Sequence, residues 1–320
     1  MNRPIKAVAA GFKTDTLRQK WSRIRRMKVL YLMLLPAIVA TFLFNYLPLS
    51  GWYIAFSRYR TGRGIFEGKF VGLENFRTFF VESTDYSYVF VNTLVINILS
   101  LLLVIGLSFV FSLLLTELCS ARYRKLVQTI SFIPYFISWI IAYSLVYAMF
   151  SSYSGVVNVV LKNLGVLNQS LNILGDKDYA WGLIICLNIW NKLGYNSIIF
   201  ISAATGIPAD QYEAAAIDGA NRWQKVWYVT IPGLIPSLVM LMVINAGWLL
   251  NPNFEQFFMF TTPTNWERME VFDMYIYKFG FQLLNYSYAT AIGIVRTVIS
   301  IALVMLVNWI SKATSGKSVI

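Results

Sequence analysis

Five hydrogen-bonding side chains interrupt an otherwise apolar stretch of the sequence and could bind a polar solute. They recur at intervals of about one helical turn: Asn188, Asn191, Lys192, Tyr195 and Asn196. At that spacing a helix places several of them on one face. The amides and the hydroxyl can hydrogen-bond to a solute, and the lysine can pair with an anionic one. A second apolar stretch adds two further candidates, Asn245 and Trp248.

These side chains also have a structural interpretation, because amides join neighbouring helices and aromatic rings mark membrane interfaces. Tyr135 and Trp139, in a third apolar stretch, carry the same two interpretations. The chain contains no histidine, which excludes His-based triads and argues against zinc or haem. Cys119 and Cys186 are too few and too far apart to suggest a disulfide framework or a metal site. We therefore expect no catalytic and no metal-binding residue.

The composition indicates a membrane protein with several spans. Of the 320 residues, 57% are hydrophobic and 13% are charged, whereas soluble chains carry about 25% charged residues. Six apolar runs reach the roughly 20 residues that cross a bilayer: 29–49, 91–115, 126–150, 180–203, 231–250 and 288–310. The bilayer offers no water to backbone polar groups, so we expect six transmembrane helices and an all-α fold.

The chain divides into a basic segment 1–28, a six-span region 29–311 and a tail 312–320. Segment 1–28 is too basic and too interrupted to hold the apolar core of a cleavable signal. It either lies as a helix on anionic lipid or simply orients the first span. We expect two amphipathic pieces of the outer connections, 156–167 and 271–284, to lie on the membrane surface.

Lysine and arginine predict the orientation of the spans. With the N-terminus in the cytoplasm, the inner segments carry 16 basic and 5 acidic residues, and the outer segments carry 9 and 10. The inner side therefore has a net charge of +11 and the outer side −1, which satisfies the positive-inside rule. Both termini and the connection 206–232 are accordingly expected in the cytoplasm.

Prolines and charges inside the spans lead to two further expectations. Pro36 and Pro134 each remove a helix hydrogen bond and predict a kink or a tightly packed break. Arg296 lies about nine residues into the last span, too deep to reach either interface comfortably. No acidic residue lies within the spans, so we expect Arg296 to face water, a carbonyl or an acidic group of a partner subunit, with substrate contact as a second alternative.

The connection 206–232 is a polar island, GIPADQYEAAAIDGANRWQKVWYVTIP, between two apolar segments. Pro208 suits the first turn of a helix, and Asp210 and Glu213 place negative charge near its positive end. Gly219 can end that helix in a left-handed turn. Asn221 can cap a second short helix that ends before Pro232. By itself this pattern describes a helix-turn-helix connection.

The spacing of residues in this island resembles the EAA loop of ATP-binding-cassette (ABC) importer permeases. That loop reads EAA, three residues, Gly, nine residues, Ile-x-Leu-Pro, and Val229 and Ile231 are mild departures from it. The resemblance implies a type I importer permease whose cytoplasmic loop fits a groove on an ATPase subunit. The residues that it assigns to this coupling are Glu213, Ala214, Ala215, Asp218, Gly219 and Pro232.

Three other stretches resemble the branch of these permeases that takes up carbohydrates. They are FVGLENFRTFF at 70–80, LPLSGWYIAFSRYR at 47–60 and IWNKLGYNSIIFISAATGIPADQYEAAAIDGA at 189–220. The resemblance extends over roughly residues 30–312 and implies transport of an oligo- or polysaccharide; the branch includes alginate importers. Hydroxyl groups and C–H faces of sugars suit a lining of Asn, Trp and Tyr, and Lys192 would suit a uronate. The sequence does not choose between sugars.

The resemblance also implies partners. We expect a second, distinct permease, two ATPase subunits that bind ATP and Mg²⁺, and an extracytoplasmic sugar-binding protein, assembled in the bacterial inner membrane. The chain has no GxxxxGK[ST] phosphate loop, so we do not expect it to hydrolyse ATP itself or to be an enzyme. An ion-coupled secondary transporter is the alternative, but it would show inverted repeats and would leave the EAA pattern unexplained.

Overall fold

The chain divides into two units, Met1–Tyr53 and Ile54–Ile320. The computed structural model describes residues 27–118, 120–247, 249–250 and 253–315. Most of the basic segment 1–28 and the end of the tail therefore lie outside the described residues. Within the described part, five helices are long and apolar enough to cross a membrane, and a bent pair makes a sixth span. The number of spans agrees with the six apolar runs.

In the first unit, the described residues form one apolar helix. α2 (Lys28–Thr41) continues as a π-helical turn, η1 (Phe42–Tyr46), and a 3-10 helix, η2 (Leu47–Phe56), that crosses the unit boundary. α2 is one continuous helix across Pro36, so the kink predicted there is not a break in the helix. No residue of α2 is buried within this chain. A helix that is apolar all round needs lipid or another protein around it.

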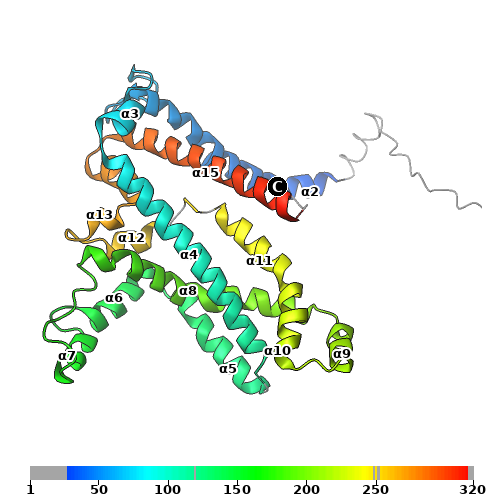
Figure 1. Cartoon of the computed structure of the whole chain (residues 1–320). Helices are drawn as coiled ribbons and strands as arrows, with labels where there is room; N and C mark the ends of the chain where they lie inside the picture. The colour runs from blue at the N-terminus through cyan, green and yellow to red at the C-terminus, as the bar shows by residue number, and fades with distance from the viewer. Residues whose placement is uncertain (1–26, 119, 248, 251–252, 316–320) are drawn as a thin grey trace, which may run out of the picture. The chain divides into compact units, whose positions relative to one another are not determined.

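In the second unit, α4 (Asp85–Thr116) and α8 (Lys177–Thr205) form the central pair of helices (Figure 1). The inward face of α4 carries small and hydroxyl side chains, including Thr93, Ser100 and Ser108, all buried. Small side chains let two helices approach closely in a bilayer, where the hydrophobic effect does not drive them together. Ser108 bonds back to the Val104 carbonyl at 2.6 Å, which satisfies its hydroxyl within the helix.

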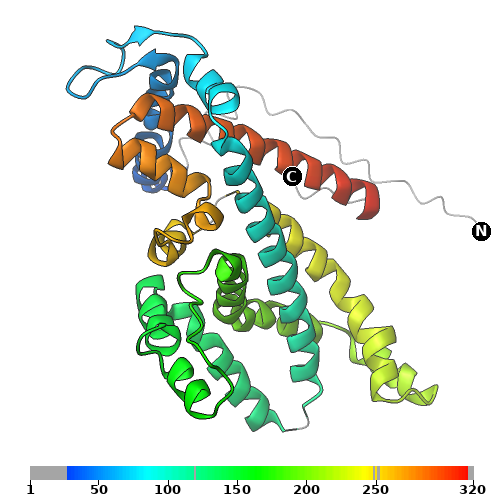
Figure 2. The ribbon, with the colours of Figure 1, turned by 60° about the vertical axis from the view of Figure 1, so that its left-hand side comes forward.

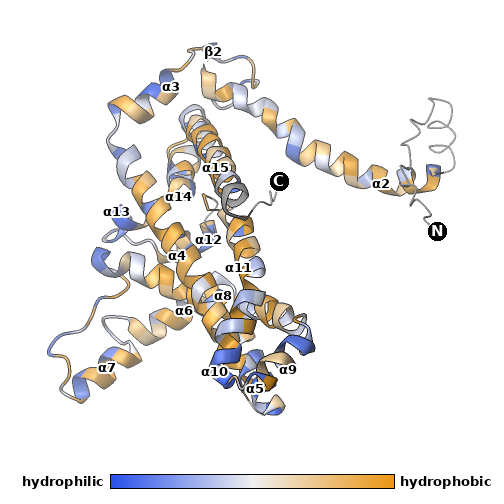
Figure 3. Cartoon of the chain, turned by 45° about the vertical axis from the view of Figure 1, so that its right-hand side comes forward, coloured by the Kyte–Doolittle hydropathy of each residue, from blue (hydrophilic) through white to orange (hydrophobic). Residues whose placement is uncertain are grey.

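Two further spans belong to this unit. α11 (Ile231–Ala246) packs on α4 and α8, and α15 (Tyr286–Ser315) is the last span of the chain. Figure 3 shows α4 and α11 apolar along most of their length, whereas the connecting helices α10 (Arg222–Lys225) and α13 (Trp266–Met269) are polar. The connection before α11 lies at one end of this helix. The short helices α12 (Phe254–Phe260), α13 and α14 (Phe272–Tyr277) lie beyond its other end (Figure 2).

The third span is broken near Pro134, which is one of the two outcomes that the sequence predicts there. α5 (Ala121–Phe132) and the 3-10 turn η4 (Ile133–Phe136) meet α6 (Trp139–Phe150) at a bend of 105°. Pro134 cannot donate a helix hydrogen bond, and Ile137 adopts an extended conformation. Ser138 then caps α6 by accepting a bond from the Ile141 amide at 3.5 Å. The chain therefore changes direction inside the apolar run.

Contacts with α8 stabilise this break. Asn191 of α8 donates a hydrogen bond of 2.8 Å to the carbonyl of Pro134. Three residues along, Gly194 lies so close to the Ser131–Phe132 backbone that a Cβ atom there would overlap the Ser131 carbonyl and lie 2.7 Å from the Phe132 nitrogen. Irregular backbone is tolerated at membrane depth only where protein satisfies it, and α8 supplies both the donor and the space.

The other connections between the spans contain short helices and one small sheet. β1 (Ser57–Arg58) pairs antiparallel with β2 (Lys69–Phe70), with Ser57 opposite Phe70. The helical elements that follow are short: α3 (Glu74–Arg77), η3 (Thr78–Glu82), α7 (Val156–Asn163), α12 (Phe254–Phe260), α13 (Trp266–Met269), α14 (Phe272–Tyr277) and η6 (Lys278–Gln282). On α7, Val156, Val159 and Val160 are exposed.

The prediction that 271–284 lies on the membrane surface is wrong for α14. Phe272 and Tyr275 are 1% and 0% exposed and pack in one core cluster with Val89 of α4 and Ile292 of α15. Just before α14, Glu270 accepts a hydrogen bond from Tyr88 at 2.6 Å. The apolar side of α14 thus faces the protein core, because the loop folds back between the first turns of α4 and α15.

The expectation for Arg296 is also wrong, because its acidic partner lies in this chain. Arg296 forms an ion pair with Asp273 of α14. The two side chains are only 22% and 16% exposed. Burial raises the pKa of the Asp273 carboxyl, and the nearby guanidinium opposes that rise. The sequence-based expectation considers only charges within the spans. Asp273 lies outside them, in the connection that precedes α15, and the fold of this connection places it next to Arg296.

The close crossing of α5 and α8 predicts opposite effects for two glycines of one helix. Gly194→Ala should lower the thermal unfolding midpoint of the purified protein, because overpacking against backbone costs about 1–3 kcal/mol. Gly182→Ala is the matched control: nothing lies within 4 Å of a Cβ at Gly182, and alanine favours a helix by about 1 kcal/mol. Equal midpoints for the two variants would contradict the packing described here.

The Arg296–Asp273 pair predicts a non-additive response. Arg296→Met leaves a buried carboxylate without its partner and should destabilise the protein by about 3 kcal/mol. Asp273→Asn should also destabilise it, whereas the double variant should recover part of the loss because no unpaired charge remains. Thermal unfolding of all four proteins measures the coupling. Additive losses would show that the two side chains do not interact.

Candidate substrate pocket and coupling loop

A polar cavity of about 110 Å³ lies between four helices of the second unit. α4, α8, α11 and α12 all contribute to its wall. Its hydrogen-bonding side chains are Asn97, Ser100, Asn188, Lys192, Asn196, Asn245, Asn253 and Gln256. Six of these are amides, one is a hydroxyl and one is a cation, and none of the described lining residues is acidic. Such a wall can hydrogen-bond to a hydroxylated solute and attract an anion.

The structure brings together four of the seven residues predicted to line a substrate path. Asn188, Lys192 and Asn196 follow one i, i+4 row of α8, and Asn245 faces them from α11. An i, i+4 row runs along one face of a helix. Trp248 lies outside the described residues.

Asn191 and Tyr195 belong to a neighbouring row of α8 and make other contacts. Asn191 bonds to the Pro134 carbonyl, which is the structural role that the sequence leaves open for amides. Tyr195 stacks on Tyr135, with ring centroids 4.2 Å apart and planes at 7°. Phe132 lies parallel to both rings, at 6.3 Å from Tyr195. Trp139, in contrast, is buried in the core.

Four residues that line the cavity are not among those predicted from the sequence. Asn97 and Ser100 lie three residues apart in the second span, so their polar types at helical spacing were a usable signal. Asn253 and Gln256 follow the apolar run 231–250 and therefore looked like outer-loop residues. They reach the cavity because α11 ends at Ala246 and the chain turns before α12. Gln256 is 1% exposed, and its amide lies 3.5 Å from the Ile184 carbonyl of α8.

Hydrogen bonds within the protein hold several of these amides in place. Asn188 donates to the Ser100 hydroxyl at 3.3 Å, and Asn97 donates to the Thr93 carbonyl at 2.7 Å. Asn245 likewise donates to the Leu241 carbonyl at 2.8 Å. Each of these bonds uses the NH₂ group, which leaves the amide oxygen as an acceptor for a hydroxyl group.

Lys192 is the cation of this cavity. Its side chain remains solvent-accessible although it lies in a concave site. No carboxylate of the described residues lies within 4.0 Å of its ammonium group in an ion pair. A charge at membrane depth is costly and indicates a functional site. Lys192 is thus placed to receive an anionic group from a solute.

The polar connection between α8 and α11 begins with a short exposed helix, α9 (Ala209–Ile217). Pro208 is its N-cap, one position earlier than predicted, and Asp210 lies in its first turn. No residue of α9 is buried. Glu213 is exposed, and Ile217 has 87% of its surface exposed. α9 therefore presents both a carboxylate and an apolar side chain to whatever binds it.

Gly219 ends α9 as the sequence predicts. Its φ is +79°, a left-handed conformation that glycine adopts without strain. The Ala220 amide donates to the Ala215 carbonyl at 2.9 Å, and the Gly219 amide donates to Ala216 at 3.1 Å. This pair of bonds is a Schellman motif, which satisfies the last carbonyls of the helix.

The second helix of the connection starts as predicted and ends differently. Asn221 and Gln224 form a reciprocal capping box, with bonds of 2.7 and 2.9 Å. α10 (Arg222–Lys225) then continues through a π-helical turn, η5 (Val226–Thr230), into α11. The helix therefore does not end before Pro232, because proline is tolerated in the first turn of the α-helical segment that follows the π turn.

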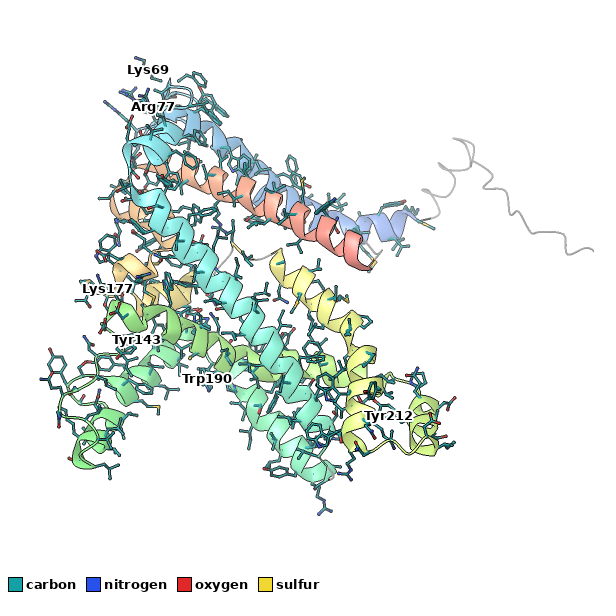
Figure 4. All side chains as sticks on the ribbon, in the orientation of Figure 1. Lys69, Arg77, Tyr143, Lys177, Trp190 and Tyr212 are labelled. Carbon is teal, nitrogen blue, oxygen red and sulfur yellow. The ribbon has the colours of Figure 1, made fainter. Side chains whose placement is uncertain are left out.

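Tyr212 links the two halves of this connection. Its hydroxyl lies 3.0 Å from that of Thr230, and Figure 4 shows its side chain on the side of α9 that faces η5. Together with the two caps, this contact gives the loop a defined shape. Of the residues assigned to coupling, Glu213, Ala214, Asp218, Gly219 and Pro232 are exposed, and Ala215 is half-buried.

Comparisons with known proteins agree with this arrangement. Residues 108–316 match the family described as "Binding-protein-dependent transport system inner membrane component". The chain is 33% identical to Protein LplB of Bacillus subtilis (strain 168) over 289 residues, 90% of each chain. It is 34% identical to the polygalacturonan/rhamnogalacturonan transport system permease protein YteP of the same strain, over 95% of this chain and 94% of YteP.

A solved structure agrees over nearly the whole fold. The crystal structure of a bacterial alginate ABC transporter, in complex with an alginate pentasaccharide-bound periplasmic protein, contains a chain that matches with a TM-score of 0.85 at 34% identity. The match covers 93% of this chain and 99% of that chain. The six spans, the EAA loop and these likenesses lead to one conclusion: the chain belongs to the family of binding-protein-dependent transport system inner membrane components, the permeases of ABC importers.

Proposed function

We propose that this permease imports an oligo- or polysaccharide whose sugars carry carboxylates. The observation that carries the proposal is the polar cavity, in which one lysine is surrounded by amides and a hydroxyl and no acidic residue. A saccharide offers hydroxyl donors and acceptors around each ring, and uronic acids add one carboxylate per sugar. The cavity offers partners for both kinds of group.

An aromatic stack on the neighbouring row of α8 supports the same class of cargo. Tyr135 and Tyr195 are each 39% exposed, and Tyr195 follows Lys192 by three residues on α8. Aromatic faces pack against the C–H faces of sugar rings, and their hydroxyl groups remain available for hydrogen bonds. A saccharide that follows α8 would thus meet rings next to the cation. Neutral solutes without hydroxyl groups would use neither feature.

The cargoes of relatives support the acidic class. One relative is a polygalacturonan/rhamnogalacturonan permease, and the solved neighbour belongs to an importer of alginate, an acidic polysaccharide. Polygalacturonan and alginate are both built from uronic acids. Lys192 offers a reason why a permease of this branch would transport such a chain, since a buried amide surface alone does not favour an anion.

We assign ATP hydrolysis to separate subunits. In the proposed assembly, this permease pairs with a second, distinct permease, two ATPases bind ATP and Mg²⁺ below, and a sugar-binding protein docks outside. The exposed α9 would fit a groove on one ATPase subunit, with Glu213 near a basic group of that subunit. Closure of the ATPases would move α9 and, through the continuous α10–η5–α11 helix, the wall of the cavity. Such rigid-body motion is a common route of alternating access.

The same proposal fixes the orientation in the inner membrane. The α9–α10 connection lies on the cytoplasmic side with both termini, as the excess of lysine and arginine in the inner segments favours. The substrate cavity then lies among the spans, and α12 to α14 lie toward the binding protein.

Replacing the cation should change which cargo is taken up. Lys192→Met should lower uptake of a uronate oligosaccharide about tenfold or more and spare a neutral one, because a hydrogen bond to a charged group contributes roughly 1.5–3 kcal/mol. Lys162→Met, on the exposed helix α7, is the control and should leave both unchanged. Uptake by reconstituted transporter with its binding protein measures both cargoes. An equal loss for both would assign Lys192 a structural role.

A bulky side chain at the end of α9 should block docking of the ATPase subunit and thereby abolish transport. Gly219→Trp and Gly165→Trp carry the same backbone strain, about 1–2 kcal/mol, since their φ values are +79° and +71°. At either site a Cβ atom would have no other atom within 4 Å, so both variants should fold and insert. Only Gly219→Trp should lose ATPase co-purification and uptake. Normal uptake in this variant would refute the coupling role.

A further inference from the structure

An apolar groove of about 590 Å³ lies beside the coupling loop, away from the substrate cavity. One wall is the last part of α4, and the other is α10, η5 and the start of α11. Its apolar side chains are Phe109, Val110, Leu113, Leu114, Trp223, Val226, Trp227 and Ile231. The two walls meet where α11 packs on α4.

The groove lies at the ends of two candidate membrane spans. Both walls belong to helices that are long and apolar enough to span a membrane, Asp85–Thr116 and Arg222–Ala246. Val110 and Leu114 are 50% and 55% exposed, and they continue the lipid-facing surface of α4. Trp227 is 64% exposed, and tryptophan is enriched at the level of lipid head groups. Exposed apolar side chains on α4 and an exposed tryptophan on η5 suit the boundary between hydrocarbon and lipid head groups.

The polar end of the groove carries one charge of each sign. Glu117 follows the last residue of α4, and Arg222 is the first residue of α10. Both side chains are exposed. A guanidinium group is well suited to bind phosphate, and a carboxylate accepts hydrogen bonds from an ammonium group. The groove thus combines an apolar slot with a rim suited to a zwitterion.

We propose that this groove binds one acyl chain of a phospholipid with a phosphoethanolamine head group. The phosphate faces Arg222, the primary ammonium faces Glu117, and the chain lies between α4 and η5. The volume is in the range of small-molecule sites, about 300–1,000 Å³, whereas a helix with its side chains is about 10 Å across. An acyl chain therefore suits the groove better than a protein helix.

The bound lipid would support the coupling loop from the membrane side. η5 forms the groove wall through Val226 and Trp227, and it contacts α9 through the Thr230–Tyr212 hydrogen bond. A filled groove holds α10 and η5 against α4, so that a push on α9 moves α11 and does not simply tilt the loop. This role is independent of which sugar is carried.

Binding of the acyl chain can be tested by substituting two leucines of α4, one inside the groove and one outside it. The assembled transporter is reconstituted in nanodiscs of phosphatidylethanolamine and phosphatidylglycerol, and retained lipids are counted by native mass spectrometry. Leu114→Asn, in the groove, should lower retained phosphatidylethanolamine about fivefold, because a polar wall without a partner disfavours a hydrocarbon chain. Leu107→Asn is the control, since Leu107 is 41% exposed on α4 and lies outside the groove. Equal retention in the two variants would overturn the proposal.

The head group is tested by lipid exchange. Phosphatidylethanolamine should be retained in preference to phosphatidylcholine, whose quaternary ammonium has no N–H to donate. Glu117→Gln should remove that preference, and Arg222→Gln should lower retention of both lipids. Retention that ignores the head group would overturn the assignment to Glu117 and Arg222. If a partner helix fills the groove, Leu114→Asn should reduce the yield of assembled transporter without changing the lipid count, which would also overturn the proposal.

Discussion

The close crossing of the broken third span over α8 is the constraint on which the rest of the second unit depends. Gly194 allows the Ser131–Phe132 backbone to lie against the helix, and Asn191 satisfies the Pro134 carbonyl. A bend of 105° inside an apolar run would otherwise expose unpaired backbone groups to lipid, at a cost of several kcal/mol each. Gly194, which has no side chain, leaves space for the bent backbone, and the Asn191 amide satisfies one of its carbonyls.

This crossing also separates the polar side chains of α8 into two sets. The row that contains Asn191 and Tyr195 is used to hold and cover the bend, through a hydrogen bond and a ring stack. The row that contains Asn188, Lys192 and Asn196 is left to face α4 and α11 across the cavity. One helix therefore both supports the fold and lines the site, because adjacent i, i+4 rows point in different directions.

Signals that act over a few residues were readable from the sequence. The capping box at Asn221, the left-handed turn at Gly219 and the six apolar runs all depend on neighbours within one or two turns, and the structure contains each of them. The partner of Arg296 was not readable, because Asp273 lies 23 residues away in a loop whose path depends on packing. Likewise, spacing alone grouped Asn191 with Asn188, and only the position of the broken span distinguishes their roles.

The two caps of the coupling loop affect how the transporter is built. Because the Schellman motif and the capping box satisfy the ends of α9 and α10 within the chain, the loop has its shape without any partner. Binding of a preshaped element avoids the entropy loss of ordering a flexible one. A partner can therefore bind this loop and leave it again without a folding step in the loop itself.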